Sequence, residues 1–131
     1  IGPYAMTDAP PPANLMLVGH KPDAVDYYGA FDLYASASTQ EGLGSALLDA
    51  VVRDIPIVAI DAGGTRDVVA DTRVLVSPQD GPGFIAALAH AIDCHGSARF
   101  AAVECGKRAR DLFSVESMVE KNIQVYREIL S

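Results

Sequence analysis

The chain has 131 residues, half of them hydrophobic, and carries a formal net charge of −7 at pH 7. This length allows one domain with a hydrophobic core, and the negative charge argues against a nucleic-acid-binding protein, which needs a basic face to neutralise phosphates. No apolar run reaches the roughly 18 residues that a membrane-spanning helix needs, and no secretory signal opens the chain.

Residues 1–13 form a Pro-rich segment that we expect to be irregular, because proline removes backbone donors and fixes φ. Residues 14–131 then form the expected domain. Four short apolar runs in it predict buried strands, at residues 15–18, 32–36, 56–60 and 74–76. The segments that follow the first three runs predict short helices, at residues 22–31, 45–53 and 65–70.

Beyond residue 79 the apolar side chains recur every three or four residues, which predicts helices at 80–95, at 98–112 and after the N-cap residue Ser114. Cys94 and Cys105 lack metal-binding spacing, so we expect free thiols. Short strands that alternate with helices predict an α/β fold. It is a Rossmann-like parallel sheet with helices on both faces, followed by a C-terminal helical segment.

Ligands of open parallel sheets bind at the carboxyl ends of the strands. Three short polar loops leave such ends here, at residues 19–21, 39–44 and 61–65. In the middle loop, Gly42 and Gly44 stand directly before a predicted helix. Glycine allows a backbone to approach a ligand closely, and the start of a helix offers N–H groups to an anion. We therefore expect this loop to bind a phosphate.

Two acids modify this interpretation. Glu41 would repel a bare phosphate, but a carboxylate accepts hydrogen bonds from hydroxyls, so the loop fits a ligand with both a phosphate and a polyol. Ser45 and Asp49 are four residues apart and share one helix face, from which Asp49 can reach a ribose diol. The alternative is that the glycines form only a tight turn and that both acids are solvated surface charges.

The segment from Glu41 to Ala59 reads E-G-L-G-S-A-L-L-D-A-V-V-R-D-I-P-I-V-A, and Gly63 to Val69 reads G-G-T-R-D-V-V. Both are similar to landmarks of the family 4 glycosyltransferases, E-G-F-G-x-x-x-x-E-A-M-x-x-G-x-P-V-V-A and G-G-x-x-E-V-V. Residues 17–126 thus resemble the C-terminal, donor-binding domain of that family, which has the GT-B fold. The chain departs from the pattern at Asp49 and Asp67, where the family has Glu, and at Asp54, where it has Gly.

The resemblance implies a donor site for a nucleoside-diphosphate sugar. Glu41 would be the catalytic residue, in contact with hydroxyls of the donor sugar. Asp49 would bind the ribose. The remaining donor-binding residues would hold the sugar, diphosphate and base, and they are Gly42, Leu43, Gly44 and Ser45 together with Gly19, His20 and Lys21.

The resemblance also implies a retaining glycosyltransferase that needs no metal or other cofactor. Its acceptor, a glycan, a lipid or a small molecule, would be bound by an N-terminal domain that this chain lacks, so we expect the chain alone to be inactive. We expect a cytoplasmic location, with peripheral association at the inner membrane as an option for the full-length protein. A non-catalytic nucleotide-sugar-binding module and self-association through an unpaired strand edge remain open alternatives.

Overall fold

The computed structural model describes residues 12–69, 71 and 74–130. Within them, three parallel strands form one sheet in the order β1-β2-β3. They are β1 (Tyr34–Ser36), β2 (Ile57–Ile60) and β3 (Leu75–Val76). In the register, Ala35 pairs with Val58, and Ala59 pairs with Leu75.

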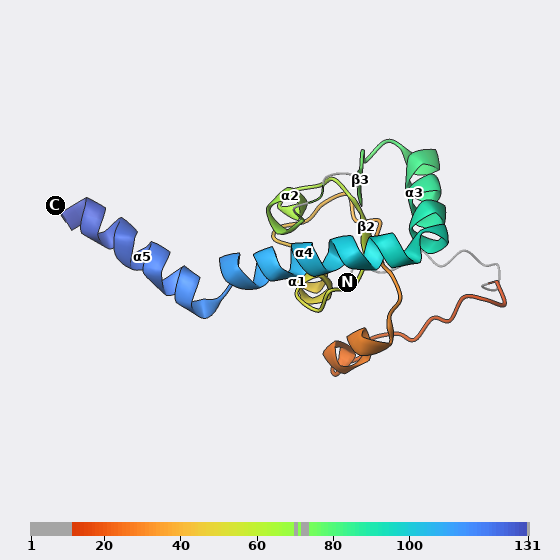
Figure 1. The fold of residues 1–131 in the computed structure, drawn as a ribbon, viewed down its shortest axis with the longest axis horizontal. Coiled ribbons are helices and arrows are strands. Elements are labelled where there is room, and N and C mark those ends of the chain that lie inside the picture. Colours follow the sequence, from red (N-terminus) through yellow and green to blue (C-terminus); the bar gives the residue numbers. More distant parts are fainter. Residues whose placement is uncertain (1–11, 70, 72–73, 131) are drawn as a thin grey trace.

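Helices surround this sheet (Figure 1). The connections contain the 3-10 helix η1 (Ala24–Ala30), α1 (Ser45–Val51) and α2 (Thr65–Val68), and the chain ends with α3 (Gly81–Asp93), α4 (His95–Leu112) and α5 (Val115–Leu130). The expected α/β, Rossmann-like arrangement is therefore confirmed. Ser114 caps α5 as expected, since its Oγ accepts a hydrogen bond of 3.1 Å from the N–H of Ser117. Among the described residues, no helix combines the length and apolar content that crossing a membrane requires.

The hydrophobic core is centred on β2, in which all four residues are buried. The apolar face of α1 packs against it through Leu47, Ala50 and Val51. Each large apolar side chain buried in this way contributes about 1.5–3 kcal/mol to the free energy of unfolding. This burial places the ends of β1 and β2, and the loops that leave them, next to the start of α1.

The expected strand at residues 15–18 is wrong. This segment belongs to no strand, and the exposed fractions of Leu15, Met16, Leu17 and Val18 lie between 51% and 82%. A strand needs a neighbour that satisfies its backbone groups and covers its apolar side chains. Among the described residues, no strand pairs with this segment, and the sheet begins at β1. Residues 1–11 of the expected Pro-rich segment lie outside the described residues.

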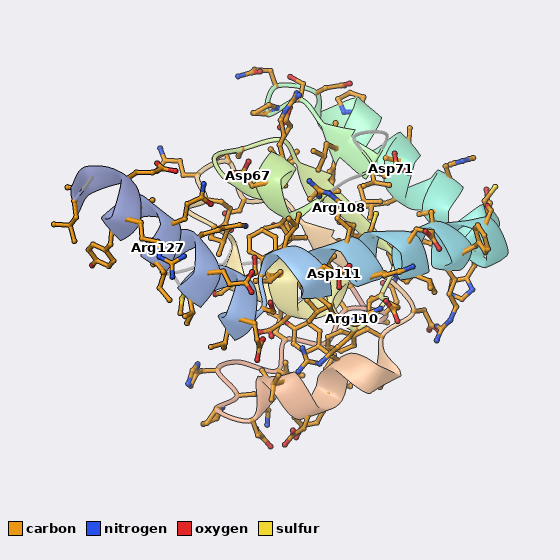
Figure 2. All side chains as sticks on the ribbon, turned by 60° about the vertical axis from the view of Figure 1, so that its left-hand side comes forward. Asp67, Asp71, Arg108, Arg110, Asp111 and Arg127 are labelled. Atoms are coloured by element: carbon orange, nitrogen blue, oxygen red, sulfur yellow. The ribbon has the colours of Figure 1, made fainter. Side chains whose placement is uncertain are left out.

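Asp54, which stands where the family pattern has Gly, adopts a left-handed conformation with φ of 59°. An aspartate tolerates this region better than most side chains do. Arg110 of α4 extends on the side opposite to Arg108 (Figure 2) and donates hydrogen bonds to the Asp54 Oδ1 at 2.8 Å and to the carbonyl oxygen of Val52 at 2.6 Å. The substitution of the family's glycine is thus accommodated by a contact between α4 and the end of α1.

Candidate functional site

The loops that leave β1 and β2 pack backbone against backbone. The N–H of Gly64 donates a hydrogen bond of 2.8 Å to the carbonyl oxygen of Gly42. A Cβ atom at Gly63 would overlap the carbonyl oxygen of Glu41, and one at Gly64 would overlap that of Gly42. Gly63 also has a φ of +53°, which L side chains rarely adopt. The two glycines therefore allow the loop of Glu41 to lie at the carboxyl end of β2.

The turn after β2 is held by its own side chains. The hydroxyl of Thr65, a residue that is 2% exposed, donates to the carbonyl oxygen of Ala62 at 2.5 Å. The Nε of Arg66 donates to the Asp61 Oδ1 at 2.7 Å, and this hydrogen bond lowers the pKa of the Asp61 carboxyl below its ordinary value. Arg66 is thus paired with Asp61 in the turn after β2.

Glu41 presents an unpaired carboxylate in this loop. Within the part of the chain that the structure describes, its side chain makes no hydrogen bond or ion pair, and it is only partly buried. Gly44 follows with φ of 74° and turns the chain into α1, where no side chain caps the first turn. Because α1 has only seven residues, its dipole is small, and the N–H groups of the loop and first turn are the available anion donors. The site therefore combines acceptors for hydroxyls with donors for an anion.

Asp49 lies further along α1 and has a basic partner. The Nη1 of Arg53 donates to the Asp49 Oδ1 at 3.1 Å and to the Asp49 carbonyl oxygen at 2.9 Å. The guanidinium carbon of Arg53 lies 5.3 Å from the ring centroid of Tyr28, close enough for a cation–π interaction. Tyr28 is 6% exposed, and its hydroxyl donates to the carbonyl oxygen of Ala46 at 3.0 Å. The ring is therefore fixed to α1 at one side of Arg53.

Glu41 and Asp49 both act electrostatically on Tyr34 of β1. Its ring stacks on Tyr28 with the centroids 6.3 Å apart. Burial, followed by the charges of Tyr28, Glu41 and Asp49, raises the pKa of Tyr34 above its ordinary value. Both carboxylates therefore lie within electrostatic range of the Tyr34 phenol.

The predicted site residues fall into two groups. The segment from Glu41 to Asp49 is the loop after β1 and the first part of α1, and its Leu43 and Ser45 are exposed. Residues 19–21 lie in an exposed stretch before η1, which Figure 1 draws apart from α2 and the strand ends beside it. The structure does not bring Gly19, His20 and Lys21 to the loop of Glu41, and their place beside the base stays a prediction.

Sequence reasoning missed several residues of this region. It placed Gly63 and Gly64 in a short polar loop and a family landmark, without their contact to the Glu41 loop. The spacing of four between Asp49 and Arg53 on a predicted helix was a usable signal for their ion pair. No local signal places Tyr28 against the backbone of Ala46, because that contact spans 18 residues.

A separate cavity of about 250 Å³ lies between β2, α3 and α4. Its walls are mainly apolar, and both cysteines, which are free as expected, line it. The Sγ of Cys94 lies 3.8 Å from the Nδ1 of His90. Since no residue of the cavity belongs to the loops that follow β1 and β2, we do not assign it to the candidate site.

Comparison with known proteins shows the family to which this chain belongs. A family model described as "Glycosyl transferases group 1" matches residues 7–94, a range that includes both glycine-containing loops. The lipopolysaccharide core biosynthesis mannosyltransferase LpsB of Rhizobium meliloti (strain 1021) is 24% identical over 121 residues, which cover 89% of this chain and 34% of that protein. The chain thus spans about one third of the length of this relative. Because the family model covers more than half of the chain, the chain belongs to the group 1 glycosyltransferases.

Proposed function

We propose that this chain is the donor-binding part of a retaining glycosyltransferase, which transfers a sugar from a nucleoside-diphosphate sugar to an acceptor. The observation that carries the proposal is the carboxylate of Glu41, which has no hydrogen-bond or ion-pair partner among the described residues and stands where two strand-end loops meet. A partly buried carboxylate that the protein leaves unpaired is available for ligand hydroxyls.

In this proposal each part of the loop and helix has one task. Glu41 accepts hydrogen bonds from hydroxyls of the donor sugar and so orients it for transfer. The N–H groups of residues 42–45 hold the diphosphate and stabilise the negative charge that grows on it as the glycosidic bond breaks. Asp49 accepts hydrogen bonds from the ribose hydroxyls. No step in this scheme uses a metal ion.

The acceptor, in this proposal, is held by a part of the protein outside these 131 residues, because the chain spans only about one third of its relative. The chain alone then binds donor without transferring it. The relative is a mannosyltransferase by name, which makes a mannosyl donor one candidate for this site. Residues 19–21 would reach the base only after the segment before η1 changes its position.

The full-length protein that carries this chain should transfer sugar from one member of a panel of UDP-, GDP- and ADP-sugars. We expect the product to keep the anomeric configuration of the donor, as measured by proton NMR of the new glycosidic bond. Donor binding without any transfer would favour the non-catalytic binding module instead. An inverted product would contradict the retaining mechanism, and absence of both binding and transfer would contradict the proposed function.

A further inference from the structure

Arg53 is a cation that the structure places directly against one of the two acids of the candidate site. Its guanidinium contacts three groups at once, the Oδ1 and the carbonyl oxygen of Asp49 and the face of Tyr28. The side chains of Arg53 and Asp49 are 38% and 46% exposed, and an exposed ion pair of this spacing is weak by itself. The aromatic contact and the second hydrogen bond therefore matter for holding the guanidinium in place.

The partners of Arg53 are themselves fixed. Tyr28 belongs to the core, stacks on Tyr34 and donates a hydrogen bond to the backbone of α1. The short side chain of Asp49 has two rotatable bonds, so contact at one of its oxygens restricts both. Arg53 thus connects the Asp49 carboxylate to the buried ring of Tyr28.

This geometry leaves the carboxylate able to bind a diol. Arg53 occupies one acceptor position of the Asp49 Oδ1, while the Oδ2 has no hydrogen-bond partner within the described part of the chain. A carboxylate has about four acceptor positions, so two neighbouring hydroxyls can still be accepted. Arg53 also offsets the negative charge of Asp49, which would otherwise repel a diphosphate ligand.

We infer that Arg53 is a positioning residue, which holds the Asp49 carboxylate for the ribose diol and so makes the site prefer ribonucleotides over 2′-deoxyribonucleotides. This inference rests on the proposed function, since it assumes that a nucleoside diphosphate binds along α1. The Arg–Asp pair is not part of the family pattern given above, which has Glu at position 49 and no fixed residue at position 53.

The test compares dissociation constants for a nucleoside diphosphate and its 2′-deoxy analogue, measured by calorimetry on the full-length protein. The donor panel identifies the base to use. A hydrogen bond between a hydroxyl and a charged group supports a ribo over deoxy preference of about tenfold or more in the unaltered protein. We expect Arg53→Gln to bring this ratio close to one and to weaken binding of the ribonucleotide. Asp49→Ala should do the same, and the double variant should lose no further preference.

Arg99→Gln is the matched control, because Arg99 is exposed on α4 and makes no hydrogen bond or ion pair with the described residues. It should leave the ratio unchanged. Arg53→Lys keeps the charge without the planar guanidinium, and we expect an intermediate ratio. If Arg53→Gln does not fold and Arg53→Lys does, the ratio of the Arg53→Lys variant decides the test.

Two failures are distinguishable. If the unaltered protein prefers the ribonucleotide and a folded Arg53→Gln or Arg53→Lys variant keeps the full ratio, the positioning role is overturned while the donor site stands. If the unaltered protein binds no nucleoside diphosphate, the proposed function fails and this inference fails with it.

Discussion

Replacing Glu41 by alanine in the full-length protein is expected to lower the rate of sugar transfer by a factor on the order of 100 to 1000, the size of effect seen when one stabilising group is removed at a reacting centre. The Glu41 carboxylate has no hydrogen-bond or ion-pair partner among the described residues and belongs to the loop that packs on Gly63, and in our proposal it orients the donor sugar. Its removal should leave folding intact, because the side chain makes no hydrogen bond or ion pair with the described residues. Initial rates at saturating donor measure the effect.

Glu104→Ala provides the control for charge, since Glu104 is exposed on α4 and belongs to neither loop. It should transfer sugar at the unaltered rate. Glu41→Gln keeps the size of the side chain and one acceptor oxygen, so we expect a smaller loss than for alanine. A Glu41→Ala variant with full activity would remove Glu41 from the mechanism.

Gly63→Ala should give the second large effect, on folding as well as activity. The new methyl group would overlap the carbonyl oxygen of Glu41, and the backbone would have to keep a φ of +53° with a side chain present. The left-handed backbone costs roughly 1–2 kcal/mol and the overlap roughly 1–3 kcal/mol, so we expect the free energy of unfolding to fall by about 2–5 kcal/mol. Urea unfolding followed by circular dichroism measures this, and transfer activity should fall together with stability because the loop of Glu41 must move.

Gly96→Ala is the matched substitution, since nothing lies within 4 Å of a Cβ at this position in the first turn of α4. Alanine is favoured over glycine in a helix by roughly 0.5–1 kcal/mol, so the variant should be slightly more stable. If Gly63→Ala unfolds at the same urea concentration as the unaltered protein, the close packing of the two loops is wrong.

Much of the sheet could be predicted because its signals are local. The β-branched run of β2 and the turn residues that flank it identify a buried strand without knowledge of its neighbours. The apolar run at residues 15–18 has the same local signal, yet it forms no strand in this structure. Whether such a run is buried depends on a pairing partner elsewhere in the chain, and no local pattern reports on that.

The candidate site, too, could be predicted from the sequence only in part. Glu41 and Asp49 could be predicted as site residues from their spacing, because a short loop and one helix connect them along the chain. The packing of Gly63 and Gly64 under the Glu41 loop could not, since it joins segments that follow different strands. The stack of Tyr28 on Tyr34, with Arg53 beside it, likewise depends on how η1 meets β1 and α1 in space.

The most direct test of the donor site is a titration of the isotopically labelled chain with nucleoside diphosphates, followed by amide chemical shifts. Our account predicts that at least one nucleotide shifts the amides of residues 41–49, and those of Gly63 and Gly64, which contact the same loop. Exposed amides of α5 should stay in place. A folded chain in which no nucleotide moves residues 41–49 would contradict the assignment of this loop and helix as the donor site.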